Sequence, residues 1–204
     1  MTCFIYNGWG GHISMMNYDN NGLLWIDCET TGLTDNDKIL EVAMHITDMR
    51  GNTLMGTIHT IIHHEPDLFN DLDDSVINMH TNNGLIHDCT HAGMSVQQAE
   101  RKLTDYMKQA NGFIDVLYPA GFSVSFDKTF INREMPAVLS NVQHRMVDLT
   151  CLNVMVSHLM PETWNHIPDF HTDHRAYTCV RGGIDRYRSY LDVFMPALES
   201  LNMK

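Results

Sequence analysis

Two acidic residues, Asp27 and Glu29, have the type and spacing that metal chemistry needs. They lie at the end of an apolar run, residues 23–28 (LLWIDC), that is typical of a buried strand. Because residues i and i+2 of a strand point to the same face, both carboxylates project together where the strand opens into a loop. Close carboxylates repel each other unless a cation lies between them, and oxygen ligands favour a hard ion such as Mg²⁺ or Mn²⁺. The pair alone is also compatible with an ordinary polar strand end.

The elements that position this pair follow an α/β order. We expect strands at residues 23–28, 39–47, 53–64 and 114–120. We expect helices at residues 71–79, 95–107, 125–139 with a break at Pro136, 148–159 and 174–190, then a tail helix to 201 interrupted by Pro196, with a loop at 161–172. The sequence therefore predicts an irregular N-terminal leader, residues 1–21, and one domain, residues 22–204.

Composition restricts the classes of function. The 204 residues are 44% hydrophobic and 19% charged, which suits a globular core and excludes a disordered chain or a membrane span. Five widely spaced cysteines suggest neither structural zinc nor a disulfide framework, so we expect a cytoplasmic protein. A net charge of −12 repels a long nucleic-acid duplex but permits a short nucleotide held with cations.

The segment IDCETTGL resembles the first motif of the DEDD superfamily of DnaQ-like 3′–5′ exonucleases. From residue 23 to about residue 190, the order of segments is similar to that of the oligoribonucleases. The segments are WIDCETTGL, ILEVAMHITD, HTNNGL, FSVSFDKTFINREMP, RMVDLT and HRAYTCVRGGIDRY. The corresponding family segments read roughly WIDLEMTGL, IIEIATLVTD, HTASGL, NSVGQDRRFLFKYMP, RYLDVS and HRALDDIRESI.

This resemblance implies an RNase H-like exonuclease fold, with a central mixed sheet flanked by helices. It implies a 3′–5′ exoribonuclease that degrades very short RNA oligonucleotides, dinucleotides above all, to 5′-mononucleotides by two-metal-ion hydrolysis. Asp27, Glu29 and Asp127 match the metal-binding acids, and His174 matches the general base. Two cations compensate the charge that develops on the phosphate oxygens, and a histidine, with an ordinary pKa of about 6.5, is suited to take a proton from water. The implied cofactor is Mg²⁺ or Mn²⁺.

One position departs from the family pattern. The fourth metal-binding acid is expected five residues after the histidine, where this sequence has Cys179. A thiolate is a soft ligand that matches Mg²⁺ poorly, so the site is weakened, uses a softer ion, or takes a carboxylate from Asp169 or Asp173. Alternatively, Cys179 is a plain buried cysteine. The protein would then be a catalytically degenerate exonuclease fold that binds or sequesters short nucleotides or a partner protein.

Further matches concern the substrate. In the resemblance, Leu33 wedges between two bases and His80 lies near the nucleotide. Ser123, Arg145 and Thr150 hold the 5′ phosphate, with Arg145 supplied across a homodimer. The alternative for Leu33 is an ordinary loop anchor, and for Ser123 and Thr150 it is a helix cap.

Two competing interpretations involve other features. His59 and His63 share one strand face and, with His64, could hold zinc, although no fourth ligand is apparent. The DxETTG motif also occurs in exonucleases that degrade DNA. The segments HTNNGL and RMVDLT favour the oligoribonuclease branch instead.

Overall fold

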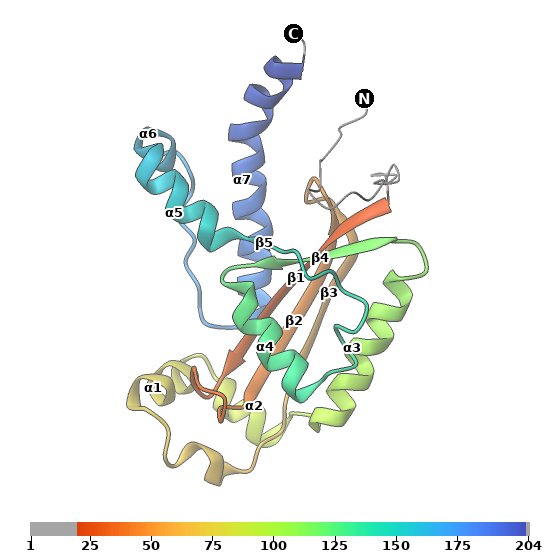
Figure 1. Cartoon of the computed structure of the whole chain (residues 1–204). Helices are drawn as coiled ribbons and strands as arrows, with labels where there is room; N and C mark the ends of the chain where they lie inside the picture. Colours follow the sequence, from red (N-terminus) through yellow and green to blue (C-terminus); the bar gives the residue numbers. More distant parts are fainter. Residues whose placement is uncertain (1–19, 203–204) are drawn as a thin grey trace.

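Five strands form one mixed sheet at the centre of the protein, whose computed structural model describes residues 20–202 (Figure 1). The strands are β1 (Asn21–Thr30), β2 (Ile39–Asp48), β3 (Thr53–Ile61), β4 (Val116–Gly121) and β5 (Val147–Asp148). They lie in the order β3-β2-β1-β4-β5. β1 is central, antiparallel to β2 and parallel to β4.

Helices cover both faces and one end of this sheet (Figure 1). They are η2 (Pro66–Phe69), α1 (Asp74–Asn82), α2 (Leu85–His91), α3 (Val96–Ala110), α4 (Val124–Glu134), α5 (Leu149–Leu159), α6 (Pro161–Trp164) and α7 (Ala176–Asn202). No helix within residues 20–202 is long and apolar enough to cross a membrane.

The alternation of side chains along β1 decides where the acidic pair points. Leu24 and Ile26 pack into the core on the α3 and α4 side. Leu23 and Trp25 pack on the other face, against α7 and α5. By the period of two along a strand, Asp27 and Glu29 continue the α7 face. The first turns of α7 therefore lie where they can complete a site with this pair.

The sequence predicted most of these elements. The four expected strands are present as β1 to β4, and four of the expected helices are present as α1, α3, α4 and α5, with shifted ends. Ser95 forms the capping box of α3 with Gln98. The leader prediction falls almost wholly on residues 1–19, which lie outside the described residues.

Two expectations were wrong, and one helix was not predicted. Pro196 does not interrupt the last helix, because α7 runs through it. A proline removes one backbone hydrogen bond, and the preceding turns are held by packing such as the stacking of Tyr190 on Phe194. The loop at 161–172 contains α6, with Pro161 in its first turn. α2 was not expected, since its burial depends on distant residues in β2 and η2.

Candidate active site

The carboxyl end of β1 opens into a cavity of about 440 Å³ between β1, α4 and the start of α7. Its lining is Asp27, Cys28, Glu29, Phe122, Phe126, Asp127, Asn153, Phe170, Thr172, His174, Cys179 and Arg186. All five residues that the sequence matched to the catalytic and metal positions therefore line one cavity of a size typical of small-ligand sites.

The carboxyls of Asp27 and Glu29 are held close together with little solvent. Burial, followed by the charges of Glu41 and Asp127, raises the pKa of Glu29 to about 8. Burial, followed by the charges of Asp127 and Glu29, raises the pKa of Asp27 well above its ordinary value. These shifts have the sign expected of buried carboxyls that lie beside other carboxyls.

The third acid, Asp127, comes from the first turn of α4. Its Oδ1 accepts the backbone N–H of Cys28 at 2.8 Å, which ties α4 to the strand position between the other two acids. Burial raises the pKa of Asp127 to about 7, although the bond from Cys28 acts in the opposite direction. This carboxyl therefore belongs to the same electrostatic cluster.

Cys179 lies beside Asp27 and Glu29. One ligand atom each from Asp27, Glu29 and Cys179 lie within 4.8 Å of one another, and in the described part of the chain this is the one group of three such residues. Burial and the charge of Asp27 raise the pKa of the Cys179 thiol, so it is neutral at pH 7. Its Sγ lies 3.0 Å from Oγ1 of Thr172. The carboxylate oxygens fit a hard divalent cation, whereas a neutral thiol is a poor ligand for one.

His174 lies just before α7, exposed to the solvent of the cavity. Its backbone has φ = 55°, a left-handed conformation that is uncommon outside glycine. Its N–H donates to Oγ1 of Thr172 at 2.9 Å. An accessible imidazole beside three acids is placed to accept a proton from water.

Asp173 and Asp169, the two acids expected as replacements for a fourth carboxylate, make other bonds or lie outside the cavity. Oδ1 of Asp173 accepts the backbone N–H of Arg175 at 3.1 Å, and its Oδ2 accepts the hydroxyl of Thr178 at 3.1 Å. These bonds fasten the start of α7. Asp169 is exposed and does not line the cavity.

The residues matched to substrate binding are dispersed. His80 is fully buried on α1, with Nε2 3.3 Å from the Thr30 carbonyl oxygen and 4.0 Å from Oε2 of Glu29. Leu33 is 84% exposed in the loop after β1. Arg145 is exposed before β5 and does not line the cavity of this chain.

Ser123 and Thr150 meet at the ends of β4 and β5, where their hydroxyl oxygens lie 3.0 Å apart. Neither side chain caps a helix. Ser123 precedes α4 without a side-chain cap bond, and Asp148 caps α5 by accepting the N–H of Thr150. The helix-cap alternative for these two residues was therefore wrong.

The aromatic wall of the cavity, Phe122, Phe126 and Phe170, was missed from the sequence. Phe122 and Phe170 stack with centroids 5.7 Å apart and an interplanar angle of 11°. A Cβ on Gly182 would lie 1.7 Å from the ring of Phe170, so this glycine lets the ring pack directly on α7. The sequence offered one signal for Phe122 and Phe126, because FSVSFD has phenylalanine at two positions where the family segment NSVGQD has polar residues.

The three histidines considered as zinc ligands, His59, His63 and His64, each contact a different residue. His59 bonds to Glu41, His64 Nε2 lies 2.8 Å from the Ile39 carbonyl oxygen, and His63 lies 3.5 Å from Glu65. They are not part of the single three-ligand group found among the described residues, and the zinc interpretation was wrong there.

Comparison with known proteins places this geometry in context. Residues 24–178 match the family described as Exonuclease (RNase_T). The chain is 30% identical over 174 residues to the oligoribonuclease of Cutibacterium acnes, covering 85% of this chain and 86% of that protein. It is 34% identical over 176 residues to the oligoribonuclease of Corynebacterium diphtheriae, covering 83% and 82%.

Solved structures agree on the fold. Exonuclease I from Methylocaldum szegediense superimposes with a TM-score of 0.63 at 16% identity, over 84% of this chain and 40% of that chain. The RNase domain of yeast Pop2 gives 0.62 at 11% identity, over 85% and 78%. These likenesses confirm the expected RNase H-like exonuclease fold, with a mixed sheet flanked by helices.

Proposed function

Because the chain belongs to the Exonuclease (RNase_T) family and is related to oligoribonucleases over most of its length, we propose that it is a 3′–5′ exoribonuclease. Its substrates are very short RNA oligonucleotides, dinucleotides above all, and its products are 5′-mononucleotides. The observation that carries the proposal is the convergence of three carboxyls with raised pKa values and an accessible histidine on one cavity.

The acids and the histidine divide the work. Asp27, Glu29 and Asp127 hold divalent cations, Mg²⁺ or Mn²⁺, which supply charge compensation to the phosphate when bound. His174 accepts the proton of the attacking water. Cys179 stands at the place of a fourth acid. Because its neutral thiol suits Mg²⁺ poorly, we expect the enzyme to prefer Mn²⁺.

The aromatic wall of the cavity suits a nucleotide. The stacked rings of Phe122 and Phe170 offer an apolar surface on which a base can pack, and base–aromatic stacking contributes about 1–3 kcal/mol per base. Arg186 lies at the same cavity with its guanidinium 5.3 Å from the Trp164 ring centroid, and it is the cavity's only arginine or lysine within the described residues. We assign it to substrate phosphate, which a planar guanidinium binds well.

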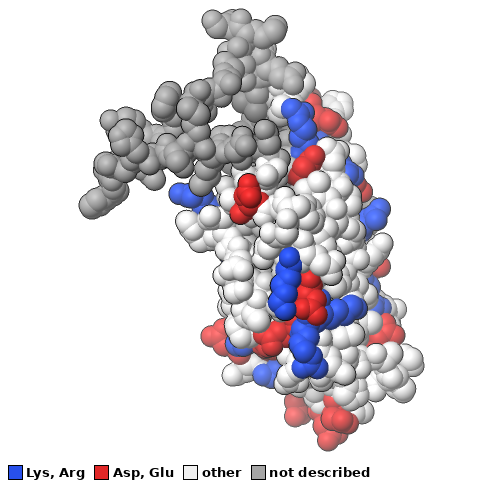
Figure 2. Space-filling view, turned by 90° about the vertical axis from the view of Figure 1, so that its right-hand side faces the viewer, with Lys and Arg blue, Asp and Glu red and all other residues white. Residues whose placement is uncertain are grey.

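Surface charge supports a short substrate. On the face shown in Figure 2, basic side chains lie among acidic ones rather than in a continuous basic tract. Long nucleic acids need many phosphate contacts, and a net charge of −12 opposes them. A substrate with one or two phosphates avoids this repulsion.

A homodimer is part of the proposal. Arg145 is exposed and outside its own cavity, as expected of a residue that serves a neighbouring subunit. The exposed apolar side chains of the α5–α6 arm offer a surface for a second copy: Val154, Met155, Leu159 and Met160. Light scattering should give about twice the 23.4 kDa of one chain, and a monomer at micromolar concentration would contradict this part. A cytoplasmic location stays a prediction.

The experiment is cleavage of a 5′-labelled RNA dinucleotide by purified protein, first with Mg²⁺ and then with Mn²⁺. We expect labelled mononucleotide to be released faster from the dinucleotide than from an RNA of about 24 nucleotides. Asp27→Ala should abolish cleavage, and Asp185→Ala, an exposed acid on α7 outside the cavity, is the matched control. If wild-type protein binds the dinucleotide but leaves it intact with both ions, the enzyme hypothesis fails. The chain would then be a degenerate exonuclease fold that binds short nucleotides.

A further inference from the structure

The backbone of His174 needs outside support. Its left-handed φ of 55° is a conformation that surrounding contacts must hold in a residue with a Cβ. Asn83, at the junction of α1 and α2, supplies two such contacts. Its Nδ2 donates to the carbonyl oxygen of His174 at 2.6 Å and to that of Asp173 at 3.1 Å. One amide therefore grips both peptide units that flank the histidine.

Asn83 is itself fixed from two directions. Its Oδ1 accepts the backbone N–H of Leu85 at 3.0 Å, at the start of α2. The backbone carbonyl oxygen of Asn83 accepts a hydrogen bond from Nη1 of Arg175 at 3.2 Å. The start of α2 thus orients the side-chain amide of Asn83, and Arg175 holds its backbone.

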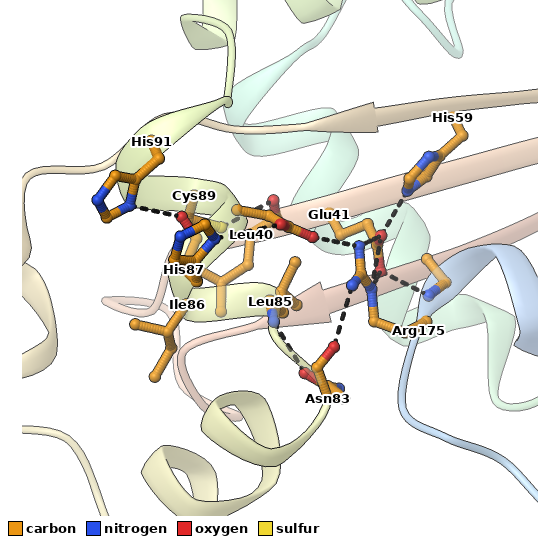
Figure 3. Close-up of polar contacts among 12 residues, drawn as sticks. Leu40, Glu41, His59, Asn83, Leu85, Ile86, His87, Cys89, His91 and Arg175 are labelled. Atoms are coloured by element: carbon orange, nitrogen blue, oxygen red, sulfur yellow. Dashed lines mark hydrogen bonds and ion pairs between the residues drawn. The ribbon is translucent and has the colours of Figure 1, made fainter.

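Arg175 carries the same support into the sheet (Figure 3). Its Nη2 donates to Oε1 of Glu41 at 2.8 Å and to Oδ2 of Asp88 at 3.0 Å. The backbone N–H of Ala176 donates to Oε2 of Glu41 at 2.8 Å. Because Glu41 is fully buried in β2, the residues on both sides of the α7 start are attached to a rigid strand.

We infer that Asn83, together with the Arg175–Glu41 pair, forms a clasp that positions the general base, His174. The inference rests on the proposed function and adds positioning residues to it. The resemblance does not supply Asn83, because the family segment HTASGL has serine at that place in HTNNGL. The clasp acts through the histidine backbone, and Asn83 itself does not line the cavity.

The test is Asn83→Asp, which keeps an oxygen for the Leu85 N–H and removes the amide donor to His174. Asn82→Asp adds the same charge at an exposed neighbouring position and is the control. With saturating Mn²⁺ and a dinucleotide, we expect kcat to fall about 10- to 100-fold, because small displacements of a reacting group have effects of that size. We expect KM and the Kd for Mn²⁺ to stay within about twofold of wild type, since the acids and the cavity wall are untouched. Hydrogen exchange at residues 172–176 should accelerate, and Asn82→Asp should change none of these quantities.

An unchanged kcat in an active protein would overturn the clasp. A parallel loss of kcat, Mn²⁺ affinity and melting temperature would also overturn it, because Asn83 would then be a general structural residue. If the wild type cleaves nothing with either ion, the proposed function fails and hydrogen exchange alone decides the clasp. In that case, faster exchange at 172–176 in Asn83→Asp alone supports it, and equal exchange in both variants overturns it.

Discussion

Glu29 and Glu41 face each other directly across β1 and β2, yet their surroundings are opposite. Glu41 is fully buried and accepts bonds from Arg175, the Ala176 N–H and His59. Burial alone would raise the pKa of Glu41, but the bonds from His59 and Arg175 lower it. Glu29 is also buried, and burial followed by the charges of Glu41, Asp127 and Asp173 raises its pKa to about 8, against the opposing charge of Arg175.

The contrast separates a structural carboxylate from a functional one. The Glu41 region contains the partners that a buried charge needs, so its ion pair can hold the start of α7. Around Glu29 burial and the neighbouring carboxyls outweigh the charge of Arg175, and a divalent cation is the partner that suits clustered carboxylates. We propose that, because of these different neighbours, Glu41 holds the start of α7 and Glu29 binds metal for catalysis.

Glu29→Gln should have the largest effect on activity. Removing one metal-binding carboxylate should lower kcat/KM by about 10³-fold or more, which corresponds to about 4 kcal/mol of transition-state stabilisation. The same change should stabilise the metal-free protein at pH 8, because it removes a buried repulsive charge. Dinucleotide cleavage and thermal unfolding in EDTA measure the two effects. Loss of both activity and stability would contradict the assignment.

The pH dependence of metal-free stability sharpens this result. Glu29 and Asp127 have folded pKa values of about 8 and about 7, above their ordinary values. The folded state therefore binds more protons, and stability present below about pH 4.5 is lost as the pH rises through 7 and 8. We expect the melting temperature in EDTA to fall over this window, by less in Glu29→Gln, and Mn²⁺ to restore it. A melting temperature that rises from pH 5 to 8 without metal would refute the raised pKa values.

Glu41→Gln should act on stability first. It leaves the half-buried Arg175 with a weakened partner, and breaking a buried ion pair costs about 3–5 kcal/mol. Chemical denaturation at pH 7 measures the loss, which we expect to be unaffected by EDTA. Equal stability changes of the same sign in Glu29→Gln and Glu41→Gln would break the distinction between the two glutamates.

Cys179→Asp should shift the metal preference. Restoring a hard ligand beside Asp27 and Glu29 should raise Mg²⁺-supported cleavage by about 10²-fold and reduce the advantage of Mn²⁺. The added carboxylate should also lower metal-free stability at pH 8, as one more like charge in the cluster. Unchanged rates with both ions would show that Cys179 lies outside the working metal site.

The sequence predicted what depends on local pattern. The period of two in LLWIDCE placed Asp27 and Glu29 on one face, and the capping serine placed the start of α3. These features follow from neighbours within one element or one turn. The place of Cys179 beside the acids came instead from the resemblance, which puts a metal-binding acid five residues after the histidine.

The rest depended on contacts between distant segments. Asn83 reaches His174 across 91 positions and Glu41 meets Arg175 across 134, so no local pattern indicated either contact. Phe170 lines the cavity because Gly182 has no side chain that would collide with its ring. In the sequence, Gly182 indicates only a residue that is unfavourable within a helix. The partners of the three zinc-like histidines were likewise set by packing rather than by spacing.

The most direct test compares wild type with His174→Ala in a single-turnover assay, with Mn²⁺ and a 5′-labelled dinucleotide. We expect both proteins to bind the dinucleotide with similar Kd, because the acids and the aromatic wall are retained. Wild type should convert it to mononucleotides, whereas His174→Ala should cleave at least about 10²-fold more slowly, as expected for loss of a general base. Cleavage by His174→Ala at the wild-type rate, or an intact dinucleotide with the wild type, would contradict the assignment of this cavity as a nuclease centre.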